Sequence, residues 1–371
     1  MSRFLPLITL TVLFYSPSLR ADEKSIADAI RVIRSVGKEG AGNDAATKAS
    51  KTLIESGALI PSLEAFSGST PTAKNWLRST VAAIVDKVNG TGQSLPADLL
   101  LAFVVTKSHD PAARAIAFHL FTAMKPNEAK AMLPTFIDDA SLELRREAIA
   151  DRLAKLKDDA SDLKVLFEST RDKDQAEQIA KLLDEKGTKV DLTSHFGYLT
   201  TWNVCGPFDS TAGNGFAKSY PPESGFESLK SFMGKGDKSF GWKTISTTAK
   251  YGMVDLNKEL GKSMDAVAYA TAQFESDSER PCDVRVGSKN AVHIYLNGKK
   301  LFEREAYHHG FDMDQHIGTG TLKKGLNEVV HKVVQNNQKE NWAQDWAFNL
   351  RVCDETGGKL PIRITTPEVK K

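Results

Sequence analysis

The 371-residue chain carries 49 Lys and Arg against 47 Asp and Glu, and its first 21 positions hold Arg3 and Arg20 but no acid. The remainder is therefore neutral, with 47 residues of each sign. Neutrality disfavours a nucleic-acid binder, which needs a basic face to neutralise phosphates, and it disfavours a polybasic membrane anchor. A hydrophobic content of 41% is typical of a globular protein, and the length suggests two domains.

Residues 1–21 predict a secretory signal peptide. Arg3 supplies the positive charge, Phe4 to Tyr15 supply the apolar stretch, and Ala21 would precede the cleavage point. An uncleaved anchor is the alternative, but the apolar run is shorter than the roughly 20 residues that span a bilayer. We therefore expect an exported protein, periplasmic or extracellular, without membrane insertion after cleavage.

Three cysteines, Cys205, Cys282 and Cys353, leave at least one thiol unpaired. Strand parity places Cys282 with buried apolar residues and turns Cys205 and Cys353 to the opposite side of their strands. A Cys205–Cys353 disulfide is one reading, and three free thiols are the other.

Composition changes near residue 190. Residues 22–190 hold 27 Ala and no Tyr, whereas residues 191–371 hold 11 Ala and six Tyr. Because alanine favours helices and aromatic residues favour strands, the sequence predicts a helical domain followed by a β domain. The expected parts are a signal peptide (1–21), a helical domain (22–190), a β domain (191–365) and a polar tail (366–371).

The first half shows apolar residues at helical spacing, as in the stripe from Ile26 to Val36, and Asp110-Pro111 marks a helix start. The segment around residues 114–120 is similar to the one around 147–153. An Asp-containing turn followed by an Ala-rich amphipathic helix resembles HEAT-like helical repeats, which would make residues 22–190 an α-solenoid and a scaffold. An irregular helical bundle is the alternative.

The second half contains short apolar segments of alternating character, and Asn297-Gly298 between two of them is a strong hairpin signal. Such a set predicts a β-sandwich. The expected strands are Val267–Phe274, Asp283–Gly287, Ala291–Leu296, Leu326–Val334 and Trp346–Cys353.

The hairpin Val292–Lys300 (VHIYLNGKK), the turn at Lys323-Lys324-Gly325 and the Trp202–Asp209 segment (WNVCGPFD) carry a more specific likeness. Together they resemble galactose-binding-like jelly rolls, such as the sugar-binding domains that accompany family 2 glycoside hydrolases, and modules of exported planctomycete proteins. The resemblance covers about residues 198–356. It implies a jelly-roll β-sandwich and carbohydrate binding.

Candidate ligand-binding residues come from one polar loop and from the segment around a tryptophan that lies outside any strand pattern. Sugar rings stack on flat aromatic side chains, so an exposed tryptophan next to polar groups suits a glycan. The His and Asp residues of the loop could also ligate a divalent metal, although their spacing matches no zinc signature. The alternative for the loop is a solvated turn. These residues are Tyr307, His308, His309, Asp312, Asp314, Trp342 and Asp345.

The sequence contains no HExxH, GxSxG or GxGxxG motif, so we expect neither an enzyme nor a cofactor. The favoured function is glycan recognition by the β domain, with the helical array as scaffold. A protein-interaction module and a hydrolase with an unrecognised site are the alternatives. The expected partner is a carbohydrate or a protein surface.

Overall fold

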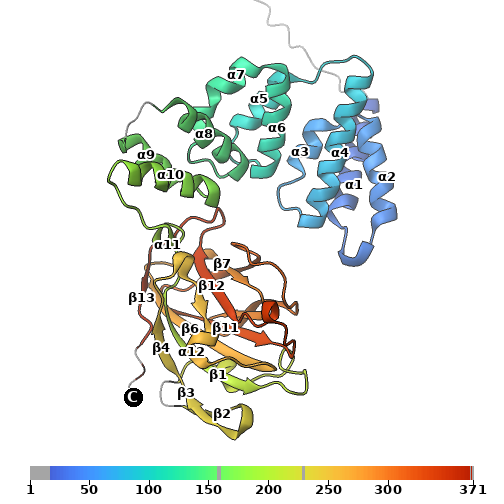
Figure 1. Cartoon of the computed structure of the whole chain (residues 1–371). Helices are drawn as coiled ribbons and strands as arrows, with labels where there is room; N and C mark the ends of the chain where they lie inside the picture. The colour runs from blue at the N-terminus through green and yellow to red at the C-terminus, as the bar shows by residue number, and fades with distance from the viewer. Residues whose placement is uncertain (1–16, 157–159, 228–229, 368, 370–371) are drawn as a thin grey trace, which may run out of the picture. The chain divides into compact units, whose positions relative to one another are not determined.

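The computed structural model describes residues 17–156, 160–227, 230–367 and 369. Most of the expected signal peptide, residues 1–16, lies outside the described residues, and helix α1 begins at Pro17 and continues past Ala21. The chain forms two compact units, Met1–Asp151 and Arg152–Lys371 (Figure 1). Helices precede antiparallel sheets, as the composition predicts.

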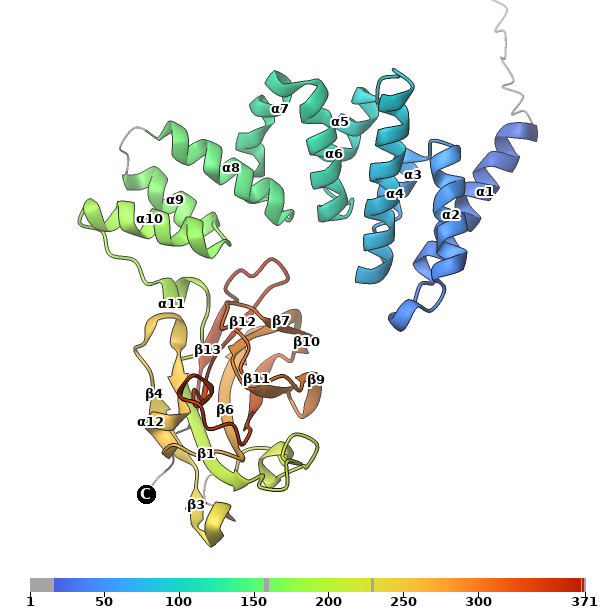
Figure 2. The ribbon, with the colours of Figure 1, turned by 45° about the vertical axis from the view of Figure 1, so that its right-hand side comes forward.

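The first unit is entirely helical where it is described, and Figure 2 shows its helices in chain order. Buried aliphatic and aromatic side chains, from Ala29 in the first helix to Ala148 in the last, form one core. The expected stripe in the first helix is confirmed by buried Ala29 and Ile33, while Val36, which is also buried, lies beyond the end of the helix at Arg34. The elements are α1 (Pro17–Arg34), η1 (Lys38–Gly40), α2 (Asn43–Glu55), α3 (Leu59–Glu64), α4 (Pro71–Gly90), α5 (Ala97–Val105), α6 (Pro111–Met124), α7 (Pro126–Met132), η2 (Leu133–Phe136) and α8 (Leu142–Lys155), the last of which continues into the second unit.

The start of α6 is built as the sequence predicts. The Asp110 carboxylate accepts hydrogen bonds from the backbone of Ala112 and Ala113, and Pro111 is the first helical residue. Buried Arg114 forms a bidentate pair with Asp139, at 2.7 and 3.0 Å, which ties α6 to the loop before α8. Helices α6 and α8 begin 31 residues apart, at Pro111 and Leu142, rather than at the spacing of 33 that the sequence similarity suggests.

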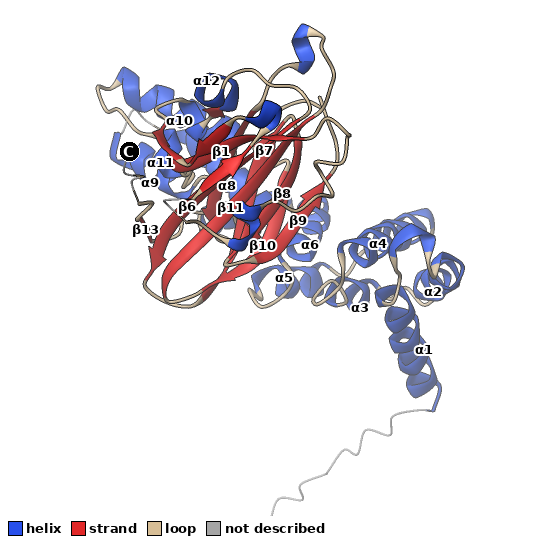
Figure 3. Cartoon of the chain, turned by 90° about the horizontal axis from the view of Figure 1, so that it is seen from below, coloured by secondary structure: helices blue, strands red, loops and turns tan. Residues whose placement is uncertain are grey.

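The second unit begins with helices and continues into strands, all of whose pairings are antiparallel (Figure 3). The five expected strands are present as β6, β7, β8, β11 and β12. The elements are α9 (Ala160–Ser169), α10 (Lys173–Glu185), α11 (Leu192–His195), β1 (Thr201–Asp209), η3 (Pro221–Ser224), β2 (Ser231–Met233), η4 (Lys235–Asp237), β3 (Ser239–Gly241), β4 (Lys243–Ser246), η5 (Lys250–Gly252), β5 (Val254–Asp255), α12 (Leu256–Leu260), β6 (Ala266–Ser276), β7 (Arg280–Ser288), β8 (Ala291–Leu296), β9 (Lys299–Arg304), β10 (His316–Leu322), β11 (Gly325–Gln335), η6 (Asn341–Ala343), β12 (Ala347–Cys353) and β13 (Ile362–Ile364).

A large sheet has the order β4-β1-β6-β11-β8-β9, with β13 also paired to β6, and a small sheet has the order β10-β7-β12-β5. Alternate side chains of both sheets share one core, in which Trp202 of β1 meets Phe348 of β12 edge-to-face at 5.2 Å. The hairpin at Asn297-Gly298 is confirmed, with positive φ at both residues, the conformation that a tight two-residue turn requires.

The outer face of the large sheet is buried as well, which the strand alternation does not predict. The segment between β1 and β4 covers it, because Tyr220, Phe232 and Trp242 of this segment form an aromatic cluster with Phe208 of β1. Buried Lys332 of β11 fastens this cover, because its ammonium group donates to the carbonyls of Phe216 and Lys218 at 2.9 and 2.7 Å and to the Glu223 carboxylate at 3.2 Å. The face of β8 that carries His293 and Tyr295 is therefore part of a second, partly polar interior.

The expected Cys205–Cys353 disulfide is wrong: all three cysteines are free and buried. Cys205 and Cys353 do lie on the sides of their strands that face away from the shared core, as the strand alternation predicts, but the two strands belong to different sheets. Cys205 lies on the covered outer face of the large sheet, whereas Cys353 belongs to the small sheet and its Sγ lies 3.8 Å from the Asp283 carbonyl oxygen. Both sheets and their shared core separate the two thiols, and Cys282 lies in that core.

Helix α10 is fastened to the sheets within the second unit by a polar contact. Glu177 accepts hydrogen bonds from the Tyr251 hydroxyl at 2.6 Å and from Lys250 at 2.7 Å, which lowers the pKa of its carboxyl. Helices after Arg152 therefore pack with the strands, so the compact second unit begins earlier than the change in composition near residue 190. Of the expected polar tail, 368 and 370–371 lie outside the described residues, while the Pro367 carbonyl accepts from Asn203.

Candidate functional site

Trp342 is the most exposed of the candidate residues that could bind a flat ligand, with 61% of its surface accessible. It lies in the short turn η6 between β11 and β12. The turn is rigidly anchored, because its neighbour Ala343 is fully buried and accepts a hydrogen bond from Gln335 at 3.0 Å through its carbonyl. The tryptophan ring is thus presented to solvent on a fixed support.

His308 packs against this tryptophan with its ring perpendicular to the indole, at a centroid distance of 5.6 Å. Its Nε2 donates to Asn336 Oδ1 at 2.7 Å, and its backbone NH donates to the Lys289 carbonyl at 2.7 Å. These two hydrogen bonds fix a residue whose φ of 57° is unusual for a side chain with a Cβ. The loop that contains His308 is therefore held next to Trp342.

Asp345 joins this group through Lys289, whose ammonium group lies 2.6 Å from the Asp345 carboxylate. Both side chains are partly exposed, so their hydrogen-bonding capacity is only partly used. We call Trp342, His308, Asn336, Lys289 and Asp345 the Trp342 surface. It offers one flat apolar ring with hydrogen-bond donors and acceptors beside it. The ring of a polar ligand can stack on the flat side chain, while the hydrogen bonds determine the orientation of the ligand.

Tyr307 lies at the border of the Trp342 surface, with its ring 6.2 Å from that of His308. It is half-buried and packs against the aromatic cluster on the large sheet. Burial raises the pKa of Tyr307 to about 12, and the nearby Glu305 carboxylate, which accepts a hydrogen bond from the Tyr307 hydroxyl at 3.4 Å, acts in the same direction. Tyr307 is therefore a supporting residue with one exposed edge.

His309, Asp312 and Asp314 lie elsewhere, on the loop that crosses the small sheet. The His309 ring is 5.7 Å from that of His316, and the side chain of Asp312 is exposed. The Asp312 carbonyl lies 2.5 Å from where a Cβ at Gly287 would be, so only glycine admits the loop at that point of β7. Within the described structure, no ring contact or hydrogen bond joins these three residues to Trp342.

Asp314 has a structural role. Its carboxylate accepts from Arg351 Nε at 2.8 Å and from Arg285 Nη1 at 3.1 Å, beneath the loop and above β7 and β12. Burial alone would raise the pKa of this carboxyl, but the two guanidinium groups outweigh it and hold the pKa below its usual range. Both oxygens of the carboxylate are hydrogen-bonded to arginines, so the contacts of Asp314 do not support the proposed ligand role.

The loop does not assemble a metal site. Among the described residues, no three or more His, Cys, Asp or Glu side chains converge in a group that could hold a metal ion. Asp314 is paired with arginines, and His308 is paired with an amide.

Sequence reasoning missed Lys289 and Asn336. Both follow strands directly, in the polar runs Ser288-Lys289-Asn290 and Gln335-Asn336-Asn337. Lys289 also lies just before β8, which pairs antiparallel with β11 so that Ala291 is opposite Val334. The start of β8 and the end of β11 therefore lie side by side, and the two runs would have been a usable signal if this pairing had been known.

No family model and no curated protein matches the chain. Solved structures that it matches include an FMN-binding beta-glucuronidase from Facaelibacterium prausnitzii L2-6, at 12% identity and a TM-score of 0.25 over 41% of this chain and 21% of that one. A beta-glucosidase from Kluyveromyces marxianus in complex with glucose matches at 13% identity and a TM-score of 0.28, over 77% of this chain and 34% of that one. A GH31 alpha-xylosidase from Xanthomonas citri matches at 12% identity and a TM-score of 0.20, over 31% and 15%.

The chain thus spans at most about a third of the length of these structures. All of them are named as glycosidases, so the expectation that the chain is not an enzyme is wrong. At these TM-scores no residue role is transferred from them. Within the part of the chain that the structure describes, no helix has the length and apolarity required to cross a membrane.

Proposed function

We propose that the second unit binds carbohydrate through the Trp342 surface. The observation that carries this proposal is the 61% exposure of Trp342 on an anchored turn, beside the polar side chains of His308, Lys289 and Asp345. A large aromatic side chain exposed in this way lowers the solubility of the protein. It contributes strongly to the binding free energy when a ligand covers it.

The contacts around the ring favour an uncharged sugar over a charged ligand. Lys289 and Asp345 neutralise each other at 2.6 Å, so the surface has no unpaired charge from this pair. Hydroxyl groups can donate to the exposed carboxylate oxygens and accept from the ammonium group without separating the two charges. The chain outside residues 1–21 is also neutral, with 47 residues of each sign.

A glycan array probed with the full chain tests the proposal, followed by calorimetry on the best-bound glycan. Trp342→Ala should weaken that binding by about 10- to 100-fold, because stacking on the indole is lost. Trp342→Phe should retain part of the affinity, since it keeps a flat ring.

Met233→Ala is the matched control, because Met233 is an equally exposed large apolar side chain, at 64%, on the separate β2-β3 hairpin. Binding that Trp342→Ala leaves unchanged would place the glycan elsewhere. Absence of binding to every glycan would contradict the proposal and favour a protein-interaction module.

For the two folds we propose a HEAT-like array in the first unit and a galactose-binding-like jelly roll in the second. The helix starts at Pro111 and Leu142, each followed by a buried arginine at its fourth position, Arg114 and Arg145, support a repeat of 31 residues. The two antiparallel sheets with a shared core support the second assignment. In this arrangement the first unit serves as a scaffold.

We also propose that the protein is exported after cleavage behind Ala21, to the periplasm or the cell exterior, since residues 1–21 carry the signal-peptide pattern. Amino-terminal sequencing of the protein recovered from cells that produce the full chain should then begin at Asp22. A protein that retains Met1, or that stays in the cytoplasmic fraction, would contradict export.

A further inference from the structure

Two adjoining cavities lie where α11 and the segment before β1 meet the segment that leads into β13. Their volumes are about 310 and 340 Å³, each at the lower end of the range of roughly 300–1,000 Å³ typical of small-molecule sites. They share Asp191, Ser194 and Lys359 in their walls, so they meet at these residues. Both lie entirely within the second unit.

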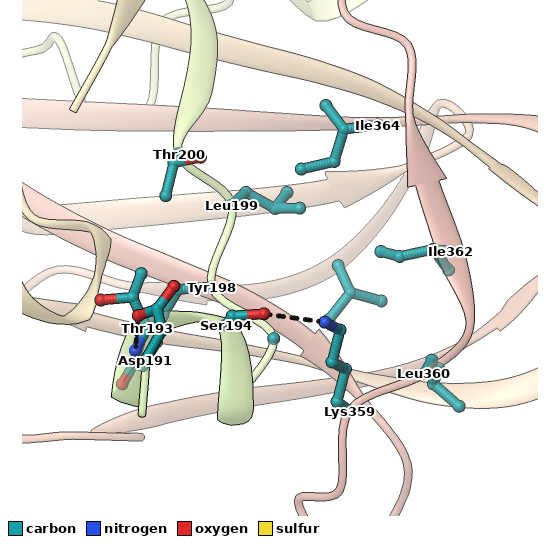
Figure 4. A pocket seen from close by; sticks show the side chains of 12 residues that line it. Asp191, Thr193, Ser194, Tyr198, Leu199, Thr200, Lys359, Leu360, Ile362 and Ile364 are labelled. Carbon is teal, nitrogen blue, oxygen red and sulfur yellow. Dashed lines mark hydrogen bonds between the residues drawn. The ribbon is translucent and has the colours of Figure 1, made fainter. Parts of the chain in front are cut away.

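The first cavity is largely apolar on one side. Figure 4 shows Leu199, Leu360, Ile362 and Ile364 around it. Leu199 and Leu360 belong to the core between the sheets, yet they line this opening, and Ile364 is 40% exposed. An apolar group that entered here would cover hydrocarbon surface that is now in contact with water, which favours binding.

The second cavity carries cationic side chains without acidic partners. Among the described residues, the Lys359 ammonium donates one hydrogen bond, to Ser194 Oγ at 3.0 Å, which is drawn in Figure 4. Arg171 uses Nη1 to donate to the carbonyls of Glu168 and Thr170, while its Nε is buried without a hydrogen-bond partner in the described structure. No carboxylate of the described residues lies within ion-pair distance of Arg171 or Lys359.

The nearby acidic groups are exposed or engaged in other contacts. Asp191 accepts the backbone NH of Thr193 at 2.9 Å as the N-cap of α11. Asp354 Oδ1 accepts the backbone NH groups of Thr356 and Gly358, while its Oδ2 lies on the side of the Arg171 guanidinium without forming an ion pair with it. Glu168 is exposed at the wall. His195 bonds to the Thr170 carbonyl, and burial lowers its pKa to about 4, so its ring is neutral near pH 7.

We propose that these two cavities form one binding site for a small amphipathic carboxylate. The carboxylate group contacts Lys359 and Arg171, and the apolar part lies against Leu360, Ile362 and Ile364. Guanidinium and ammonium groups form charge-assisted hydrogen bonds with carboxylates, which are about twice as strong as neutral ones. This site is separate from the Trp342 surface and does not depend on carbohydrate binding.

Calorimetry on the full chain with hexanoate as the probe tests the site, with acetate and 1-hexanol as matched compounds that lack the apolar tail or the charge. Hexanoate should bind about ten-fold or more tightly than either compound. Lys359→Met and Arg171→Met should each weaken hexanoate binding by a similar factor, and Lys359→Arg should retain it.

Lys262→Met is the control for charge, because Lys262 is an exposed lysine elsewhere in the second unit. Hexanoate that fails to bind, binds no better than 1-hexanol, or binds the two Met variants as well as the native chain would overturn the proposal. Lys359→Met should leave glycan binding unchanged, so failure of this site and failure of the Trp342 surface are distinguishable. Circular dichroism verifies that each variant is folded.

Discussion

Asp314 and Asp312 show that two carboxylates in one loop, two residues apart, meet different environments. Asp314 lies between Arg285 and Arg351 above the small sheet, whereas the Asp312 side chain is exposed. Removing one partner from a largely buried ion pair leaves the other charges uncompensated, which is costly. Asp314 is therefore one of the residues that hold the loop over β7 and β12, together with His308 and Gln315.

We expect Asp314→Asn to lower the free energy of unfolding by about 3 kcal/mol at neutral pH, measured by urea denaturation. Because the folded-state pKa of Asp314 is lowered, its ionised form stabilises the fold above the unfolded pKa of about 3.9. The difference between native and variant should shrink as the pH falls through the folded pKa.

Asp312→Asn is the matched control and should change the free energy of unfolding by less than about 0.5 kcal/mol, because the side chain is exposed. Equal losses for the two variants would refute the structural role of Asp314. A native-to-variant difference that grew on acidification would refute the sign of its pKa shift.

Helix α6 is positioned by one interaction between neighbouring residues and by one between residues far apart in the chain. The local signal is the Asp110-Pro111 start, which the sequence shows directly. The distant one is Arg114, which is buried although arginine seldom is, and which pairs with Asp139 across 25 residues of chain. From the sequence alone, an arginine in an apolar helix is predicted to be exposed to solvent, because its buried partner is not known.

Arg114→Met should reduce the free energy of unfolding by about 3 kcal/mol, because Asp139 would remain as an unpaired buried charge. Combining it with Asp139→Leu should recover part of the loss, although not the hydrogen bond from the Ser141 backbone to Asp139. Urea unfolding followed by circular dichroism measures both variants.

Arg78→Met, at an exposed arginine on α4, should alter the stability by less than about 0.5 kcal/mol. An Arg114→Met variant as stable as this control would show that the buried pair contributes nothing.

Across the whole molecule, four histidines in the second unit are buried enough to stay neutral. Burial lowers the pKa of His195, His293 and His316 to about 4 and that of His331 to about 3. In the unfolded chain these groups titrate near 6.5. Between these values the unfolded state binds more protons than the folded state, so the folded state loses stability as the pH falls.

We therefore expect the urea midpoint of the native protein to decrease steadily from about pH 6.5 to about pH 4. His331→Leu should make this decrease less steep, because His331 is fully buried between β8 and Phe348. A midpoint that stayed flat, or that rose toward pH 4, would contradict the prediction.

The sequence by itself determined the order of helices and strands, the start of α6 and the hairpin at Asn297-Gly298, whereas the exposure of Trp342 was one of two alternatives. These features follow from neighbouring residues, through apolar periodicity, capping and turn conformation. Only the tertiary structure decided what lies on each outer sheet face, because that depends on segments far apart in the chain. It separated Cys205 from Cys353, assigned Asp314 to two arginines, and brought Lys289 and Asn336 to His308 beside Trp342.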